Sequence, residues 1–197
     1  MREVSLHSVQ QLHDKIALRH ELRGKRGSMT AAERRKAELG AALQARRNGW
    51  LKPGKRIAAY IPVGSEFSSW PLMLLALKLG AEVYVPRVPK NGKQLEFVRL
   101  DQHTSWSAGA YGIPEPSHEK TCLPHRLDTV FLPLVGYDDQ GFRLGQGGGY
   151  YDATFAFRRL RKYWLKPRLI GLGFECQKAS HLPVDHWDLK LDAVLSG

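Results

Sequence analysis

The chain has 197 residues, 43% of them apolar, and a formal net charge of +11. This length and apolar content allow one sizeable core, so we expect a single domain over residues 1–197. No apolar stretch reaches the roughly 20 residues that cross a bilayer, and charges interrupt every apolar group near the start, so we expect neither a membrane span nor a secretory signal. We therefore expect a soluble, cytoplasmic protein whose two cysteines, Cys122 and Cys176, stay reduced.

The positive charge is concentrated in residues 1–56, which carry 14 lysine and arginine residues against 5 acidic ones. A basic segment of this kind can bind nucleic acid, a membrane surface or a polyanionic small molecule, or it can form a solvated helix face. Charge alone does not choose among these partners.

The first half of the chain predicts two helices and then a strand, a helix and a strand. Residues before Gly24 show loose helical spacing, and the segment TAAE (residues 30–33) matches a capping box that opens an alanine-rich helix through Arg47. RIAAYIPV predicts a buried strand, SSWPLMLLALKLG a helix and AEVYVPRV a second strand. Strand, helix and strand in succession predict a βαβ unit with a largely parallel sheet.

The second half continues this alternation. QLEFVRL predicts a strand, the proline-bearing AYGIPEPSHEKTCLPHRL a loop, and TVFLPLVGYD another buried strand. YYDATFAFRRLRKYW has the pattern of an amphipathic helix, and RLIGLGF and LDAVLS predict two closing strands. The predicted fold class is α/β, with a mostly parallel sheet flanked by helices on both faces in a Rossmann-like three-layer arrangement.

The most informative segment is GFRLGQGGGYYD (residues 141–152), which holds five glycines, one arginine and one aspartate. A strand, a glycine-rich loop and a helix in that order direct backbone N–H groups at phosphate oxygens. The segment is not a Walker P-loop, because no Lys-Ser or Lys-Thr follows, and Tyr150 takes the place of the last glycine of a dinucleotide fingerprint. A plain turn needs only one or two glycines, so phosphate binding is the favoured interpretation.

This segment resembles the signature G-x-R-L-G-x-G-x-G-Y-Y-D of the 5-formyltetrahydrofolate cyclo-ligase family, also called 5,10-methenyltetrahydrofolate synthetase. Further similarity lies in KIALR, EFSS, VYVPRV, GAYGIPEP, GLGFECQ and DLKLDAVLS, so the resemblance spans nearly the whole chain. The chain departs from the family pattern at Gln146, often basic or aromatic in relatives, at Ser69, where threonine is common, and in its LSG ending. We give Gln146 no phosphate role.

The resemblance implies an enzyme that uses Mg-ATP to convert 5-formyltetrahydrofolate into 5,10-methenyltetrahydrofolate, with release of ADP and phosphate. In the implied reaction the formyl oxygen is phosphorylated, the neighbouring folate nitrogen attacks the activated carbon, and phosphate leaves. Such a reaction depends on positioning and on charge neutralisation. The implied partners are ATP, Mg²⁺ and a folate, with or without a polyglutamate tail, rather than a membrane or a nucleic acid.

The resemblance also implies roles for particular residues. The implied catalytic residues are Arg143, which would clamp phosphate, and Asp152, which would hold Mg²⁺ together with Asp188. Glu66 would accept pterin N–H donors, and Tyr111 would pack on an aromatic ring of folate. The residues implied to bind folate are Glu66, Tyr111, Arg19 and Gly147, and those implied to bind ATP are Lys15, Arg19, Arg143, Leu144, Gly145, Gly147, Gly148, Gly149, Tyr150 and Tyr151.

Two other functions stay open from the residues alone. The first is a zinc site formed by His118, Cys122 and His125 in HEKTCLPH, with Cys176 or another histidine as the fourth ligand. The spacing of these residues matches no zinc template. The alternative outside enzymes is an RNA-binding protein that uses the basic N-terminal helices, which would leave the composition of the glycine-rich segment without a purpose. No G-x-S-x-G elbow supports serine hydrolase chemistry.

Overall fold

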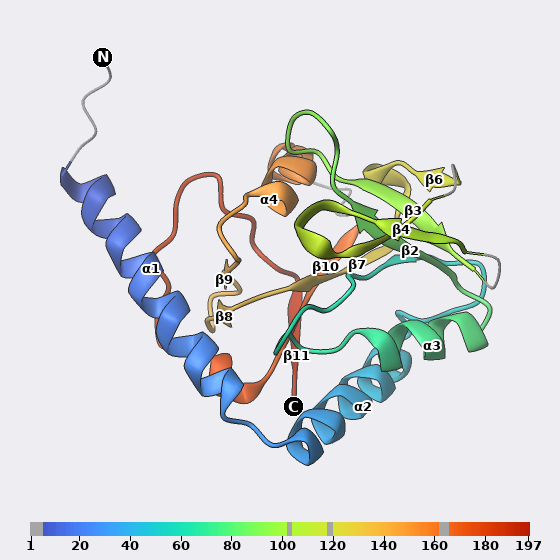
Figure 1. Ribbon diagram of the computed structural model, residues 1–197, viewed down its shortest axis with the longest axis horizontal. Helices are drawn as coiled ribbons and strands as arrows, with labels where there is room; N and C mark the ends of the chain where they lie inside the picture. The colour runs from blue at the N-terminus through green and yellow to red at the C-terminus, as the bar shows by residue number, and fades with distance from the viewer. Residues whose placement is uncertain (1–5, 102–103, 118–119, 162–165) are drawn as a thin grey trace.

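A computed structural model gives the structure of the protein and describes residues 6–101, 104–117, 120–161 and 166–197 (Figure 1). The helices are α1 (Leu6–Gly27), α2 (Ala31–Arg47), α3 (Trp70–Lys78) and α4 (Tyr150–Thr154), and the 3₁₀ turns are Ala110–Gly112, Pro124–Arg126, Ala156–Leu160 and Glu175–Gln177. The strands are β1 (Arg56–Ala58), β2 (Glu82–Arg87), β3 (Glu96–Leu100), β4 (Trp106–Ala108), β5 (Pro114–Pro116), β6 (Thr121–Cys122), β7 (Thr129–Pro133), β8 (Gly136–Tyr137), β9 (Arg143–Leu144), β10 (Arg168–Gly173) and β11 (Ala193–Ser196).

The main sheet has seven strands in the order β11-β10-β7-β1-β2-β3-β6. The pairs from β11 to β2 are parallel, and the β2–β3 and β3–β6 pairs are antiparallel. The predicted α/β class, the mostly parallel sheet and the β1–α3–β2 unit are therefore confirmed. The chain adds β2 on one side of β1 and β7 on the other, so the strand order reverses between β1 and β7. In open α/β sheets, ligands bind in the crevice beyond the carboxyl ends of strands at such a point.

Side chains along the strands alternate between two cores, one on each face of the sheet. On β2, Val83 and Val85 pack with residues of α2 and α3, whereas Tyr84 packs in the other core. On β7, Phe131 belongs to the first core and Val130 to the second. Because successive strand residues point to opposite faces, this pattern means that both faces are covered, as the three-layer prediction requires.

The two faces are covered by different elements, with α2 and α3 on one side and α4 on the other (Figure 1). The buried face of α2 consists of alanines, which let its backbone approach the sheet closely, namely Ala37, Ala41, Ala42 and Ala45. A Cβ atom placed on Gly197 would lie only 2.7 Å from the Cα of Ala37. On the other face, Phe155, directly after α4, is fully buried.

The predicted capping box at the start of α2 is confirmed. The Glu33 N–H donates to the Thr30 hydroxyl at 3.3 Å, and the Thr30 N–H donates to the Glu33 carboxylate at 2.8 Å. These bonds satisfy two backbone donors that the helix itself cannot pair.

The segment predicted as one long loop contains secondary structure. Its β5 pairs with β4, which precedes the segment, in an antiparallel hairpin in which Ser107 lies opposite Glu115, and its β6 is the edge strand of the main sheet, paired with β3. β5 was predicted as a loop because it has a proline at each end. A strand at an edge tolerates proline because its outer N–H groups need no partner in the sheet.

The amphipathic helix predicted from Tyr150 to Trp164 is much shorter than expected. α4 ends at Thr154, and a 3₁₀ turn over Ala156–Leu160 follows. The Thr154 hydroxyl donates to the Tyr150 carbonyl at 2.6 Å, and the chain turns so that Phe155 enters the core. Packing of one large side chain therefore overrides the helical periodicity. Residues 162–165 of the predicted helix lie outside the described residues.

No helix in the described part of the chain combines the length and the apolar character needed to cross a membrane. The thiols of Cys122 and Cys176 are both free. They pack on opposite faces of the sheet, so this fold keeps them from pairing with each other.

A buried glutamine fixes the segment that leads into the glycine-rich loop. Gln177 has no exposed surface; its side-chain amide donates to the carbonyls of Leu134 and Val135 at 3.0 and 2.9 Å and accepts from the Phe174 N–H at 2.9 Å. These contacts tie the end of β10 to the residues between β7 and β8.

We predict that Gln177→Met destabilises the protein by roughly 2–4 kcal/mol, because it leaves three buried backbone groups without this partner. Chemical denaturation of the variant and the wild type measures the difference. Gln140→Met, on the exposed β8–β9 turn, is the control and should change the free energy of unfolding by less than about 0.5 kcal/mol. Equal stability of the two variants would contradict the assigned role of Gln177.

Candidate functional site

A pocket of about 640 Å³ opens where the strand order reverses. Its walls include Tyr60 after β1, Val88 after β2 and Pro133 at the end of β7, together with α1 and the glycine loop, residues 145–149. Every residue that the family resemblance implies in binding or catalysis lines this one pocket: Lys15, Arg19, Glu66, Tyr111, Arg143, Leu144, Gly145, Gly147, Gly148, Gly149, Tyr150, Tyr151, Asp152 and Asp188.

The glycine loop is held at its base by the β8–β9 hairpin. Asp138, which is 3% exposed, accepts the N–H groups of Gln140 and Phe142 with one carboxylate oxygen and the Leu182 N–H with the other. Within the loop, Gly147 and Gly149 have φ values of 107° and 70°, in the region that only glycine adopts readily. The glycines therefore permit a loop shape that other residues would strain.

Arg143 and Asp152 form a largely buried ion pair at the inner end of the pocket. Arg143 Nη2 lies 3.0 Å from each oxygen of Asp152, and the Leu189 N–H donates to Asp152 Oδ1 at 3.2 Å. The Arg143 side chain is 5% exposed, and its Nε is buried without a hydrogen-bond partner among the described residues. A buried donor of this kind is costly unless something accepts from it. Arg143 thus retains capacity for an anionic ligand.

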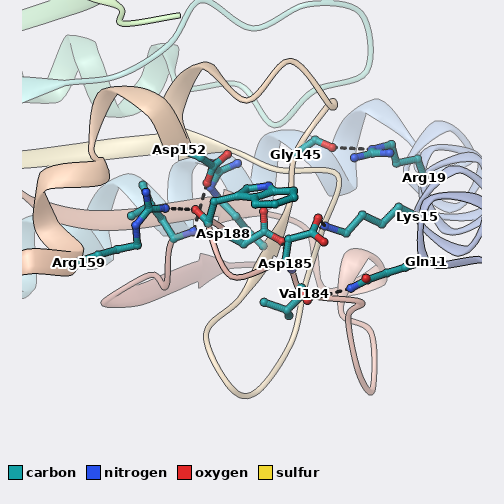
Figure 2. A network of polar contacts seen from close by, with 12 residues as sticks. Gln11, Lys15, Arg19, Gly145, Asp152, Arg159, Val184, Asp185 and Asp188 are labelled. Carbon is teal, nitrogen blue, oxygen red and sulfur yellow. Dashed lines mark hydrogen bonds and ion pairs between the residues drawn. The ribbon is translucent and has the colours of Figure 1, made fainter. Parts of the chain in front are cut away.

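A second set of ion pairs joins α1 to the segment before β11. Lys15 Nζ lies 2.6 Å from Asp185 Oδ2 and 2.9 Å from Asp188 Oδ2 (Figure 2). Burial alone lowers the pKa of Lys15, but the hydrogen bonds to both aspartates outweigh burial and raise it overall. Lys15 is therefore an ammonium at neutral pH and forms ion pairs with two carboxylates at the pocket.

Arg19 contacts the glycine loop directly from α1. Its Nε donates to the Gly145 carbonyl at 2.8 Å, as Figure 2 shows. A Cβ atom on Gly147 would lie 3.6 Å from Arg19 Nη2, so the guanidinium rests against the middle of the loop. One helical turn separates Lys15 and Arg19, which places both cations on the pocket side of α1.

Glu66 is connected to the glycine loop through Gln146. One Glu66 oxygen accepts the Val63 N–H at 3.1 Å, and the other accepts the Gln146 side-chain amide at 2.8 Å. The Gln146 amide oxygen in turn accepts from Arg23 of α1. Gln146, to which sequence reasoning gave no phosphate role, thus links three segments that border the pocket.

Tyr111 lies at the mouth of the pocket in an unusual backbone conformation. Its φ is 58°, the residue is 75% exposed, and its hydroxyl lies 2.9 Å from the hydroxyl of Tyr150. The two rings meet edge to face with centroids 6.4 Å apart. The turn that carries Tyr111 therefore contacts the residue that follows the glycine loop.

Sequence reasoning missed several residues of the pocket. Asp185 lies three residues before the predicted metal ligand Asp188, and Trp187 lies between them. A second aspartate so close to a predicted metal ligand was a signal that could have been used. Glu115 lay inside a motif quoted for the resemblance but received no role. The apolar wall residues lacked any signal of their own; they are Leu12, Ile61, Val63, Pro86, Val88, Leu95, Ile113 and Pro133.

The zinc alternative gains no support from the described residues. Cys122 is buried, and its Sγ contacts the Leu123 carbonyl at 3.6 Å. In the part of the chain that the structure describes, no three His, Cys, Asp or Glu side chains are grouped closely enough to hold a metal. His118, one of the ligands considered, lies outside that part.

The chemistry of the acidic residues suits Mg²⁺ better than a metal held by protein alone. Asp152 and Asp188 line the same pocket, with side chains 18% and 19% exposed. Mg²⁺ is usually bound by one or two carboxylates, with water and phosphate oxygens completing its shell. A pair of carboxylates beside a loop that can bind phosphate fits that pattern.

These features define a class before any comparison: an α/β protein in which one pocket combines three cations, five carboxylates, a glycine loop and an apolar wall. Comparison with known proteins makes the class specific. Residues 11–197 match the sequence model of the 5-formyltetrahydrofolate cyclo-ligase family. The chain belongs to the 5-formyltetrahydrofolate cyclo-ligase family and is an enzyme of that family.

Individual relatives agree with this assignment. The 5-formyltetrahydrofolate cyclo-ligase of Haemophilus influenzae is 33% identical over 185 residues, covering 91% of this chain and 96% of that protein. The Mus musculus protein of the same name is 30% identical over 189 residues, covering 92% of each chain. The NMR structure of Aquifex aeolicus 5,10-methenyltetrahydrofolate synthetase, 28% identical, superposes with a TM-score of 0.77 and covers 92% of this chain and 89% of that chain.

We predict that Gly145→Ala slows conversion of 5-formyltetrahydrofolate by at least about tenfold, because a small displacement of a positioning group is costly to catalysis. The added Cβ would lie 2.7 Å from Arg143 Nη1 and would displace the guanidinium. Gly40→Ala, in α2, is the control, since a Cβ there meets nothing within 4 Å. A Gly145→Ala variant with the wild-type rate would show that the position of the Arg143 guanidinium does not matter.

Proposed function

We propose that the protein uses Mg-ATP to convert 5-formyltetrahydrofolate into 5,10-methenyltetrahydrofolate, with release of ADP and phosphate. One observation carries this proposal. Segments far apart in the sequence, namely α1, the β1–α3 connection, the turn after β4, the glycine loop and the segment before β11, bring all the residues implied by the family resemblance to one pocket. A shared pocket is what a reaction between ATP and folate requires, because phosphoryl transfer needs the two reactants in contact.

The cations and the glycine loop would bind the ATP phosphates. Arg143 offers a buried Nε–H without an acceptor among the described residues, and Lys15 and Arg19 reach the same pocket from α1. Open backbone N–H groups of a glycine loop suit phosphate oxygens, as does the planar fork of arginine. The full set of residues proposed to contact ATP is Lys15, Arg19, Arg143, Leu144, Gly145, Gly147, Gly148, Gly149, Tyr150 and Tyr151.

Asp152 and Asp188 would hold Mg²⁺. The ion would neutralise charge on the phosphates when bound. Each carboxylate is paired with a cation in the structure, Asp152 with Arg143 and Asp188 with Lys15. These cations keep the carboxylates compensated, and they would be available to pair with ATP phosphates when Mg²⁺ is bound by the carboxylates.

The proposed reaction begins with attack of the formyl oxygen on the terminal phosphorus of ATP, which breaks the bond to ADP. The folate nitrogen N10 then attacks the formyl carbon and loses its proton, and the carbon–oxygen bond breaks to release phosphate. The protein contributes position and charge: Arg143 and the glycine loop would orient the phosphoryl group. Burial of Arg143 strengthens this interaction because little water competes with it.

Folate would occupy the apolar side of the pocket. Tyr111 would pack against a folate ring, Glu66 would accept folate N–H donors, and Arg19 and Gly147, which lie near each other, would border both ligands. The basic residues of the N-terminal helices would attract ATP and a polyglutamate tail, because both ligands are negatively charged.

The RNA-binding alternative fits the structure less well. Arg26, which is 4% exposed, donates to the Ser65 hydroxyl, and Arg34 donates to the Ser65 carbonyl at 2.7 Å. Arg23 donates to Gln146. These cations are engaged with loops that border the pocket, so they do not form an open phosphate-binding face for a polynucleotide.

The proposal is tested by incubating the protein with Mg-ATP and 5-formyltetrahydrofolate and following the more conjugated methenyl product by absorbance. We expect product only when protein, ATP and Mg²⁺ are all present, with one ADP for each product. Absence of product at high protein concentration would overturn the proposal.

We predict that Asp152→Asn lowers turnover by about a hundredfold and raises the Mg²⁺ concentration needed for half-maximal rate, because an amide is a weaker Mg²⁺ ligand than a carboxylate. Rates are measured across a Mg²⁺ titration. The matched control is Asp192→Asn, since Asp192 also pairs with an arginine, Arg158, at 2.9 Å but lies outside the pocket.

Both substitutions leave an arginine without its carboxylate, so both are expected to lower the free energy of unfolding. Only Asp152→Asn should change the Mg²⁺ dependence. A wild-type rate for Asp152→Asn at limiting Mg²⁺ would remove Asp152 from the metal site.

A further inference from the structure

Glu115 is a buried carboxylate in the pocket to which neither the family resemblance nor the proposed chemistry gives a role. It is 9% exposed, it lies in β5, and it lines the pocket together with Tyr111 and Val88. Its side chain packs on the backbone of Gly109, where an added Cβ would lie 2.3 Å from the Glu115 Cδ. The chain therefore makes room for this carboxylate at a position where any other residue than glycine would collide with it.

The hydrogen bonding of Glu115 is incomplete. Glu115 Oε1 accepts the Val88 N–H at 3.2 Å, and within the described ranges this is the one hydrogen bond of the Glu115 side chain; no described lysine, arginine or histidine forms an ion pair with it. A carboxylate can accept about four hydrogen bonds, and burying one without partners is costly. Glu115 is thus a charged acceptor at the pocket with most of its capacity unused.

Glu66 provides a useful contrast. Both oxygens of Glu66 already accept hydrogen bonds, one from Val63 and one from Gln146. Glu66 is also the less buried of the two, since its residue class is half-buried whereas Glu115 is buried. Of the two glutamates in the pocket, Glu115 therefore has the larger unused capacity to receive a pair of donors from a ligand.

The surroundings of Glu115 indicate the shape of that ligand. Around it the pocket wall is apolar, with Pro86 and Val88 from the end of β2, Leu95 from before β3 and Ile113 from the turn after β4. An apolar wall with one carboxylate suits a flat heteroaromatic ring that carries adjacent N–H donors on one edge. The pterin ring of folate has such an edge, formed by N3–H and the 2-amino group.

We propose that Glu115 is the specificity-determining residue that binds the N3–H and 2-amino edge of the pterin ring. This inference rests on the proposed function and adds to it the residue that selects a pterin. Val88 holds one oxygen in place through its backbone N–H, and the prolines on both sides of Glu115 limit the backbone freedom of β5. The carboxylate is thereby preorganised, which reduces the entropy lost on binding.

The test compares two ligands and two variants. The ligands are 5-formyltetrahydrofolate and its 2-desamino-2-methyl analogue, which lacks the amino donors, and their dissociation constants are measured by calorimetric titration. Glu115→Gln keeps an oxygen for Val88 but turns an NH₂ group toward the ligand donors. Glu96→Gln, an exposed glutamate paired with Arg87 outside the pocket, is the matched control.

We expect the wild type to bind the parent folate at least about tenfold more tightly than the analogue, and Glu115→Gln to weaken the parent roughly ten- to hundredfold while barely changing the analogue. The affinity for ATP and the melting temperature should stay as in the wild type. This preference for one ligand separates recognition from a purely structural role, which would affect both ligands equally.

Several outcomes would overturn the assignment. They are equal binding of both ligands by the wild type, unchanged binding of the parent by Glu115→Gln, or equal losses for both ligands. If the wild type binds the parent normally and converts it, such a result removes only the role of Glu115. If the wild type neither binds nor converts 5-formyltetrahydrofolate, the proposed function itself fails.

Discussion

The ion pair between Arg143 and Asp152 is the interaction on which the pocket depends. It joins β9, before the glycine loop, to α4, after it, and so fixes the width of the loop between them. A buried arginine is stable only with a compensating charge, and Asp152 supplies that charge. The Arg143 guanidinium also occupies the space that a side chain at Gly145 would need. The glycine at position 145 and the buried position of Arg143 therefore depend on each other.

A second layer of charge pairing ties α1 to this centre. Lys15 bridges Asp185 and Asp188, while the Leu189 N–H donates to Asp152, so the segment before β11 contacts both α1 and the inner end of the pocket. The pocket lining therefore already pairs its cations with carboxylates before any ligand is present, with three cations against five carboxylates. Binding of a phosphate and a divalent cation together would exchange these internal pairs for ligand contacts without adding a large net charge, which limits the cost of desolvation.

The sequence predicted the fold class, and it pointed to residues that line one pocket, where local patterns carry the information. The capping box at Thr30 and the apolar strands are local signals, and the segment from Gly141 to Asp152 is long enough to be specific. The early end of α4 at Phe155, the hairpin formed by β5 and the pairing of Lys15 with Asp185 could not be predicted, because each is decided by contacts between residues far apart in the chain.

The central claim is that the pocket brings the formyl oxygen of folate into direct contact with the terminal phosphorus of ATP. The most direct measurement uses 5-formyltetrahydrofolate labelled with oxygen-18 in the formyl group, with mass spectrometry of the inorganic phosphate released during turnover. Direct phosphorylation predicts one labelled oxygen in the phosphate for each methenyl product formed, because the carbon–oxygen bond breaks as phosphate leaves. Methenyl product accompanied by unlabelled phosphate, with the label in water, would contradict the account.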